Sequence, residues 1–154
     1  MADLTWRTCV AQRILELHPE VDGLAAVHAW SAFSGVLAED VHRTLVTVAR
    51  SIPLVLLTNA TSRLRDDLSE LGILNLFSEI INSSEVGVAK PQREIFQHLF
   101  VKLRLAPQDV CFVDDSEANV RAARAEGIAS HHFIDHEDFR GFLQATLHQR
   151  FHPS

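Results

Sequence analysis

From residue 40 onwards the sequence alternates between helix-like and strand-like patterns, and this alternation restricts the fold more than any other feature. Val41, Leu45 and Val48 recur at helical spacing and predict an amphipathic helix. The run Ile52–Leu57 that follows is apolar throughout, as expected for a parallel strand that is covered on both faces. Repeated units of this kind predict an α/β fold with a doubly wound, mostly parallel sheet.

The same alternation continues to the C-terminus. Apolar stripes predict further helices that follow Asn59, Pro91, Ser116 and Ile134. Short apolar runs predict strands at Glu79–Asn82, Val110–Val113 and His132–Ile134. Pro91 is expected in the first turn of its helix, where its fixed φ angle suits the helical backbone. Gly72 and Gly127 are expected just beyond the ends of two of these helices.

The first 39 residues follow a different pattern. Val10, Ile14 and Leu17 form one helical stripe, residues 24–33 form a second, and no strand is indicated between them. We therefore predict a helical appendage over residues 1–39, joined to a single α/β unit over residues 40–154.

Composition and charge exclude several classes of function. The 154-residue chain has a formal net charge of −6 and no run of basic residues, whereas nucleic-acid and anionic-membrane partners require a basic patch. Its longest apolar run is far too short to cross a bilayer. Cys111 lies in a predicted buried strand, so a disulfide with Cys9 is not expected. The N-terminus lacks a signal-peptide pattern, and the expected compartment is the cytoplasm.

Polar side chains follow two of the predicted strands, at the edge where α/β sheets bind ligands. Thr58 and Asn59 follow one strand, Asp114 and Asp115 follow another, and Lys90 precedes a predicted helix. Each group alone is compatible with ordinary turn and helix-cap residues. Together, a hydroxyl, a lysine and two carboxylates suit a phosphoryl group with a divalent cation.

Three segments of the chain resemble sequence motifs of the haloacid dehalogenase (HAD) superfamily of hydrolases. Leu56–Ala60 resembles motif II, Gly87–Pro91 resembles motif III, and Phe112–Ser116 resembles motif IV. The motifs stand in the family's order, and the resemblance extends from residue 40 to about residue 135. It implies a HAD-like, Rossmann-like fold.

The resemblance also implies roles for individual residues. Thr58 and Lys90 would be catalytic, because the motif II threonine hydrogen-bonds the phosphoryl oxygens and the motif III lysine stabilises negative charge. Thr58, Asn59 and Lys90 would bind the substrate. Motif IV supplies carboxylates for Mg²⁺. Asp115 is expected to coordinate the metal directly, and Asp114 to be a second ligand or an outer-shell partner.

The nucleophile motif of the family is not found. It is a strand that ends in Asp-x-Asp, whose first aspartate attacks the substrate. Asp3 stands too close to the start of the sequence to end a strand. Glu20–Leu24 has only a faint similarity to the motif, and a helix–helix turn made by Pro19 and Gly23 is the favoured interpretation. Residues 1–39 are then expected to be the remnant of the family's helical cap, in a truncated product or a natural short form.

In the family, the strand that carries the nucleophile lies between those ending here at Thr58 and Asp114. Without it, buried backbone groups would remain unpaired across roughly 9–10 Å, about two strand spacings. We therefore expect that a neighbouring segment or a second chain fills the gap, for example in a homo-oligomer, or that the two strands close up.

The resemblance implies a Mg²⁺-dependent phosphatase of a small phosphorylated metabolite, with a chain that does not turn over because the nucleophile motif is not found. Two alternatives remain open at this point. One is a non-catalytic binding or regulatory module that keeps the crevice, and the other is the haloacid dehalogenase branch of the superfamily.

Overall fold

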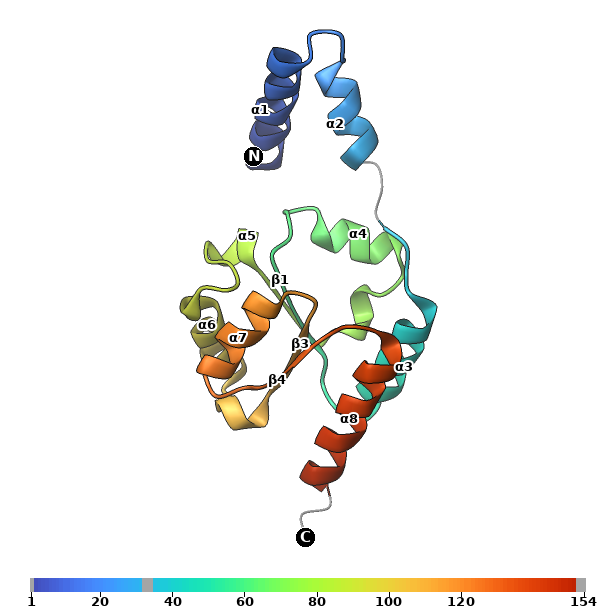
Figure 1. The fold of residues 1–154 in the computed structure, drawn as a ribbon, viewed down its shortest axis with the longest axis vertical. Coiled ribbons are helices and arrows are strands. Elements are labelled where there is room, and N and C mark those ends of the chain that lie inside the picture. The colour runs from blue at the N-terminus through green and yellow to red at the C-terminus, as the bar shows by residue number, and fades with distance from the viewer. Residues whose placement is uncertain (1, 32–34, 152–154) are drawn as a thin grey trace.

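The structure is a computed structural model that describes residues 2–31 and 35–151 (Figure 1). Its α/β part consists, in chain order, of α3 (Glu39–Ala49), β1 (Val55–Thr58), α4 (Leu64–Glu70), β2 (Glu79–Asn82), α5 (Ser83–Val86), α6 (Arg93–Leu103), β3 (Cys111–Asp114), α7 (Glu117–Ala125), β4 (Ala129–His132) and α8 (His136–Phe151). Short 3₁₀ turns lie at Leu74–Leu76 and Pro107–Asp109. Of the helices in these ranges, none is both long and apolar enough to cross a membrane. The predicted alternation of helices and strands is confirmed.

The strands form two separate parallel pairs. β1 pairs with β2, with Leu57 opposite Ile81, and β3 pairs with β4, with Val113 opposite His131. Within the described ranges β1 and β3 are not paired with each other, and no other strand lies between them. The strands are parallel as predicted, but the expected continuous sheet is divided into two. The structure therefore shows neither the closing-up of β1 and β3 nor a described segment of this chain that pairs with both.

One apolar cluster joins β1, β2 and β3 to helices α6 and α7. Ile95 and Phe96 of α6 are fully buried, and the ring of Phe96 meets that of Phe112 edge-on, with centroids 5.7 Å apart. The other buried members are Leu57, Ile81, Leu99, Ala123 and Ile128. Complete burial of a side chain such as Phe96 contributes roughly 1.5–3 kcal/mol to stability. This packing holds the carboxyl ends of β1 and β3 in place.

Several element boundaries differ from the predicted ones. β1 begins at Val55 rather than Ile52, consistent with Pro53, which has no backbone N–H to donate to a strand ladder. β4 runs from Ala129 to His132, whereas the sequence predicted a strand at His132–Ile134; the side chain of Ile134 is 71% exposed. Pro91 lies before α6 rather than in its first turn, after a cis peptide bond to Lys90.

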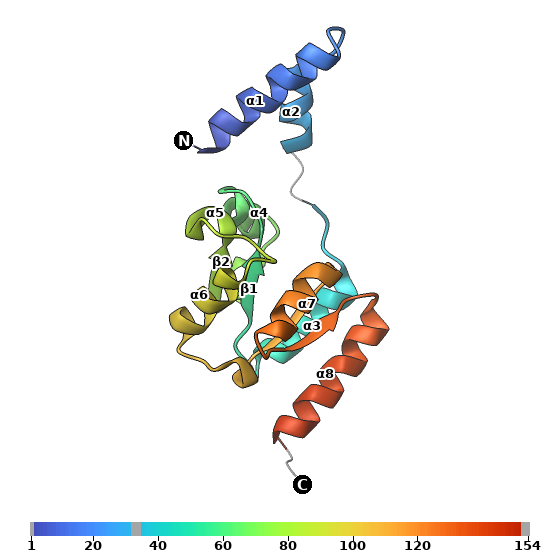
Figure 2. The ribbon, with the colours of Figure 1, turned by 60° about the vertical axis from the view of Figure 1, so that its left-hand side comes forward.

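The N-terminal helices α1 (Ala2–Leu17) and α2 (Gly23–Ser31) form a hairpin, which Figures 1 and 2 show at one end of the molecule. The turn between them confirms the helix–helix interpretation of this segment. Ala11 and Val27 are buried between the helices, whereas Leu17, which was predicted in the buried stripe, is 59% exposed. A small residue at position 11 allows the helices to approach closely. Phe33, the end of the predicted second stripe, lies outside the described residues.

Candidate active site

Asn59 fixes the backbone of Lys90 beside the end of β1. Its side-chain amide donates a hydrogen bond to the Lys90 carbonyl oxygen at 2.8 Å and accepts one from the Lys90 backbone N–H at 2.9 Å. These residues are 31 positions apart in the chain, so the paired bonds bring the predicted motif II and motif III segments together. The structure places Asn59 as the residue that positions the lysine.

The ammonium group of Lys90 lies between the two strand pairs. Nζ donates to the Leu57 carbonyl oxygen of β1 at 2.7 Å and to Oδ2 of Asp114 in β3 at 2.6 Å. It also lies 5.5 Å from the centre of the Phe112 ring. The Lys90 side chain is only 9% exposed, and a charge so far removed from water needs such partners. Because an ammonium has three N–H donors, one remains for a ligand.

The carboxylate of Asp114 is hydrogen-bonded at both oxygens. Oδ2 accepts from Lys90, and Oδ1 accepts from the Ser116 backbone N–H at 2.8 Å and from the Asn119 side chain at 2.9 Å. Burial acts to raise the pKa of the Asp114 carboxyl, but the hydrogen bonds from Lys90, Asn119 and Ser116 outweigh it and hold the pKa below its ordinary value. Asp114 is therefore an ionised partner that holds Lys90.

Asp115 and Thr58 present side-chain oxygens that no other described residue contacts through a hydrogen bond or ion pair. Asp115 is exposed, and only its backbone oxygen is engaged, at 2.9 Å from Nε2 of His132. Among the residues that the structure describes, neither the Asp115 carboxylate nor the Thr58 hydroxyl has a hydrogen-bonding or ionic partner. Both residues lie at carboxyl ends of strands that Lys90 connects, so both remain available to a ligand.

The side chains at these strand ends fit a divalent metal ion in part. An exposed carboxylate such as Asp115 offers the hard oxygen that Mg²⁺ prefers, and Mg²⁺ commonly binds one or two carboxylates together with water and phosphate. Asp114 has no oxygen left without a partner. Within the described residues no group of three potential ligands is close enough to hold a metal. Among the described residues, Asp115 thus offers an oxygen of the kind that Mg²⁺ prefers, but no complete metal cage is formed.

Asn82 is a site residue that sequence reasoning did not identify. It ends β2, its side chain is 1% exposed, and its Oδ1 accepts from the backbone N–H groups of Ala60 and Ser84 at 3.2 and 3.3 Å. Its Nδ2 donates to the Thr61 carbonyl oxygen at 2.9 Å. Asn82 therefore holds the loop that follows Thr58. A polar residue at the end of an apolar strand was the available signal.

The fold and the site together define a class of protein. A parallel α/β unit that gathers a lysine, a hydroxyl and two aspartates at its strand ends is suited to binding phosphoryl groups. The family model of the haloacid dehalogenase-like hydrolases matches residues 11–127. The chain therefore belongs to the haloacid dehalogenase-like hydrolase family, as its motifs predicted.

Two curated relatives to which the chain is similar are phosphatases. It is 37% identical over 83 residues to a phosphoglycolate phosphatase of Chromobacterium violaceum, an alignment that covers 53% of this chain and 37% of that protein. It is 35% identical over 81 residues to a phosphoserine phosphatase of Thermus thermophilus, covering 51% and 32% respectively. The matched segment thus spans about a third of these relatives.

Solved structures confirm the fold class. A predicted phosphoglycolate phosphatase from Haemophilus somnus superposes with a TM-score of 0.61 at 28% identity, covering 70% of this chain and 49% of that chain. A HAD family enzyme from Bacteroides thetaiotaomicron, solved with magnesium and inorganic phosphate, superposes with a TM-score of 0.63 at 21% identity, covering 77% and 64%. At that identity the second likeness shows the fold alone.

Proposed function

We propose that this chain carries the phosphate-binding part of a phosphatase that acts on a small phosphorylated metabolite. The contact of Lys90 with both Leu57 and Asp114 is the observation that carries the proposal. It holds an ammonium group, with one donor unused, at the strand ends where a phosphoryl group would lie. The similarity to phosphoglycolate and phosphoserine phosphatases supports phosphatase chemistry over the dehalogenase branch.

In this mechanism the ligand-binding residues stabilise charge on the phosphoryl oxygens. Lys90 would donate its third N–H to one oxygen, and the Thr58 hydroxyl would donate to another. Asp114 would hold the Lys90 ammonium in position without touching the substrate. Asn59 and Asn82 would position the backbone on either side, because both of their amides bind main-chain groups.

A magnesium ion would bind through Asp115. Its exposed carboxylate has no other partner in the described part of the chain, whereas both oxygens of Asp114 are occupied. We therefore assign Asp115 as the metal ligand and Asp114 as an outer-shell group. When bound, a divalent cation beside a phosphoryl group polarises its oxygens and neutralises developing charge.

The chain alone is proposed not to turn over. Its sequence contains no Asp-x-Asp motif, so no aspartate of that motif is available to attack phosphorus. For the same reason a non-catalytic module, which binds a phosphorylated ligand in the same crevice, is the second candidate function. The two candidate functions differ in the turnover expected when a strand with the nucleophile motif is added.

The facing edges of β1 and β3 are proposed to accept a strand from another chain, with a second copy in a homo-oligomer as one source. Neither edge is paired with a described strand, and unpaired strand edges readily template further strands. Analytical ultracentrifugation of the purified chain tests whether a second copy supplies the strand. A monomer at all concentrations would exclude a second copy.

Phosphate binding tests the proposed function directly. A calorimetric titration of the chain with inorganic phosphate in the presence of Mg²⁺ should show saturable binding. Thr58→Val keeps the shape of the side chain but removes its donor, and it should weaken binding roughly tenfold. Thr61→Val, in the loop beyond Asn59, is the matched control and should bind as the unmodified chain does.

A hydrolysis assay distinguishes the two candidate functions. The same assay tests the proposed inactivity of the chain alone. The chain alone should not hydrolyse a generic phosphomonoester with Mg²⁺. Addition of a synthetic peptide whose strand ends in Asp-x-Asp should produce turnover if the chain is part of a phosphatase, and none if it is a binding module. Turnover by the chain alone that disappears in Thr58→Val would refute the proposed inactivity.

A further inference from the structure

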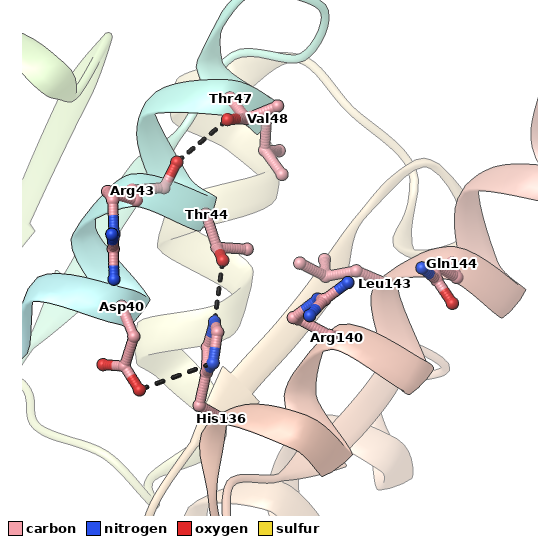
Figure 3. Close-up of a pocket in the computed structure, with 9 residues that line it drawn as sticks. All are labelled: Asp40, Arg43, Thr44, Thr47, Val48, His136, Arg140, Leu143 and Gln144. Carbon is pink, nitrogen blue, oxygen red and sulfur yellow. Dashed lines mark hydrogen bonds and ion pairs between the residues drawn. The ribbon is translucent and has the colours of Figure 1, made fainter.

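Helices α3 and α8 face each other across a groove of about 500 Å³ (Figure 3). None of the residues that line it belongs to the proposed active site. Each helix contributes a stripe of side chains at helical spacing. The polar residues that line the groove are Arg43, Thr44 and Thr47 from α3 and His136, Arg140 and Gln144 from α8. Facing stripes between neighbouring helices are usually apolar. A groove with polar side chains on both walls therefore calls for a functional explanation.

His136 connects the two walls of the groove and contacts its acidic residue, Asp40. Its Nε2 lies 2.8 Å from the Thr44 hydroxyl, and its Nδ1 lies 3.4 Å from Oδ2 of Asp40 (Figure 3). Both contacts connect the first turn of α8 to α3. Asp40 is the one carboxylate among the lining residues. It contacts His136 and not an arginine.

The side chains of the two arginines of the groove, Arg43 and Arg140, have no hydrogen-bonding or ionic partner in the part of the chain that the structure describes. Within the described residues, neither the Arg43 nor the Arg140 guanidinium forms a hydrogen bond or ion pair, although the chain has a net charge of −6. Other arginines of the α/β unit do pair, as Arg93 does with Glu126 at 2.9 Å. Two unpaired guanidinium groups, one on each wall, leave a local excess of positive charge on an acidic protein.

We propose that this groove binds the phosphate group of a small molecule, at a site separate from the Thr58–Lys90 crevice. A guanidinium presents its N–H groups in a planar fork that matches phosphate oxygens, and Arg43 and Arg140 offer such forks from opposite walls. The Gln144 amide adds a donor beside them. Val48 and Leu143 line the same groove and would contact the carbon skeleton of the ligand.

The site is tested by ¹H–¹⁵N NMR of the full chain titrated with inorganic phosphate. The backbone amides of Thr44, Thr47 and Gln144 should shift in a saturable manner. Arg43→Gln and Arg140→Gln should each weaken binding by roughly tenfold or more, the loss expected for a charge-assisted hydrogen bond. Binding should also weaken as sodium chloride is raised, because the arginines are exposed.

Two control variants separate this site from general charge effects and from the active site. Arg50→Gln removes an exposed arginine at the end of α3 that does not line the groove, and groove affinity should be unchanged. Thr58→Val alters only the crevice and should also leave the groove shifts unchanged. The proposal is overturned if the groove amides shift without saturation, or if Arg43→Gln and Arg140→Gln bind phosphate as well as Arg50→Gln does.

Discussion

The ammonium of Lys90 lies 2.6 Å from the carboxylate of Asp114, with the two side chains 9% and 6% exposed. The same ammonium reaches the Leu57 carbonyl oxygen, so this ion pair connects the β1–β2 and β3–β4 pairs at their carboxyl ends. Removing one member of a buried ion pair leaves an uncompensated charge, which costs more than the pair itself contributes. The pair is therefore both a structural joint and the centre of the proposed site.

Replacing Asp114 with asparagine should destabilise the protein by about 3 kcal/mol, because Lys90 would keep its charge without a counter-ion. Asp115→Asn is a matched control at the neighbouring position, where the carboxylate is exposed and unpaired in the described structure, and it should change stability by less than about 0.5 kcal/mol. Urea unfolding measures both. Equal costs for the two variants would contradict the role given to the Lys90–Asp114 pair.

The stabilisation by Asp114 should depend on pH in a defined direction. The folded-state pKa of Asp114 is lowered, so the unfolded chain takes up a proton at a higher pH than the folded protein does. The contribution is then complete above the ordinary aspartate pKa of about 4 and is lost as the pH falls through the folded value.

The measurement is the free energy of unfolding of the unmodified chain and of Asp114→Asn across this range. Their difference should shrink as the pH falls below about 4. The pKa of Glu79 is also lowered, chiefly by its hydrogen bond from Lys102, but that effect is present in both proteins and cancels in the comparison. A difference that does not change with pH would rule out titration of Asp114 as its source.

Much of this site could be predicted from local sequence. Thr58, Asn59, Asp114 and Asp115 stand directly after apolar runs, and the carboxyl ends of parallel strands meet at one edge. Lys90 could be predicted from its motif alone, since nothing in its neighbourhood shows that its side chain is buried. Its contacts with Leu57 and Asp114 depend on residues 33 and 24 positions away, and such contacts leave no local pattern.

The features that escaped prediction depend on packing between distant segments. Asn82 is the last residue of a predicted strand. Its contacts with Ala60 and Thr61 become apparent only when the loop after β1 lies against it. The strand predicted at His132–Ile134 overlaps β4 only at His132, where β4 ends. The gap between β1 and β3 was expected from the missing nucleophile strand, but the described residues neither fill it nor close it up as predicted.

Replacing Asn82 with alanine should loosen the loop that follows Thr58. It would leave the Ala60 N–H and the Thr61 carbonyl without their partner, at a cost of about 2 kcal/mol. Hydrogen exchange of the Ala60 amide should accelerate together with the loss of global stability. Asn75→Ala, at an exposed position, is the matched control and should change neither quantity. Unchanged protection of Ala60 in Asn82→Ala would show that the loop is held by other contacts.

The α1–α2 hairpin should be sensitive to a single added methyl group at Gly23. A Cβ at this position would overlap the carbonyl oxygen of Ala11 and lie 2.9 Å from its carbonyl carbon, and backbone cannot rotate aside as a side chain can. Gly23→Ala should therefore force the helices apart and destabilise the hairpin by roughly 1–3 kcal/mol. Gly141→Ala, in α8, meets nothing within 4 Å and should instead stabilise its helix by roughly 0.5–1 kcal/mol.

The chain provides its own reporter for this comparison. Its two tryptophans, Trp6 and Trp30, both lie in the hairpin, with ring centroids 5.5 Å apart. Tryptophan fluorescence therefore follows the hairpin alone, while far-ultraviolet circular dichroism is dominated by the α/β unit. In Gly23→Ala the fluorescence transition should move to lower urea concentration, and the dichroism transition should stay close to that of the unmodified chain. If both transitions move together, the hairpin and the α/β unit unfold as one cooperative body. If neither moves, the close approach of Gly23 to Ala11 does not hold the helices together.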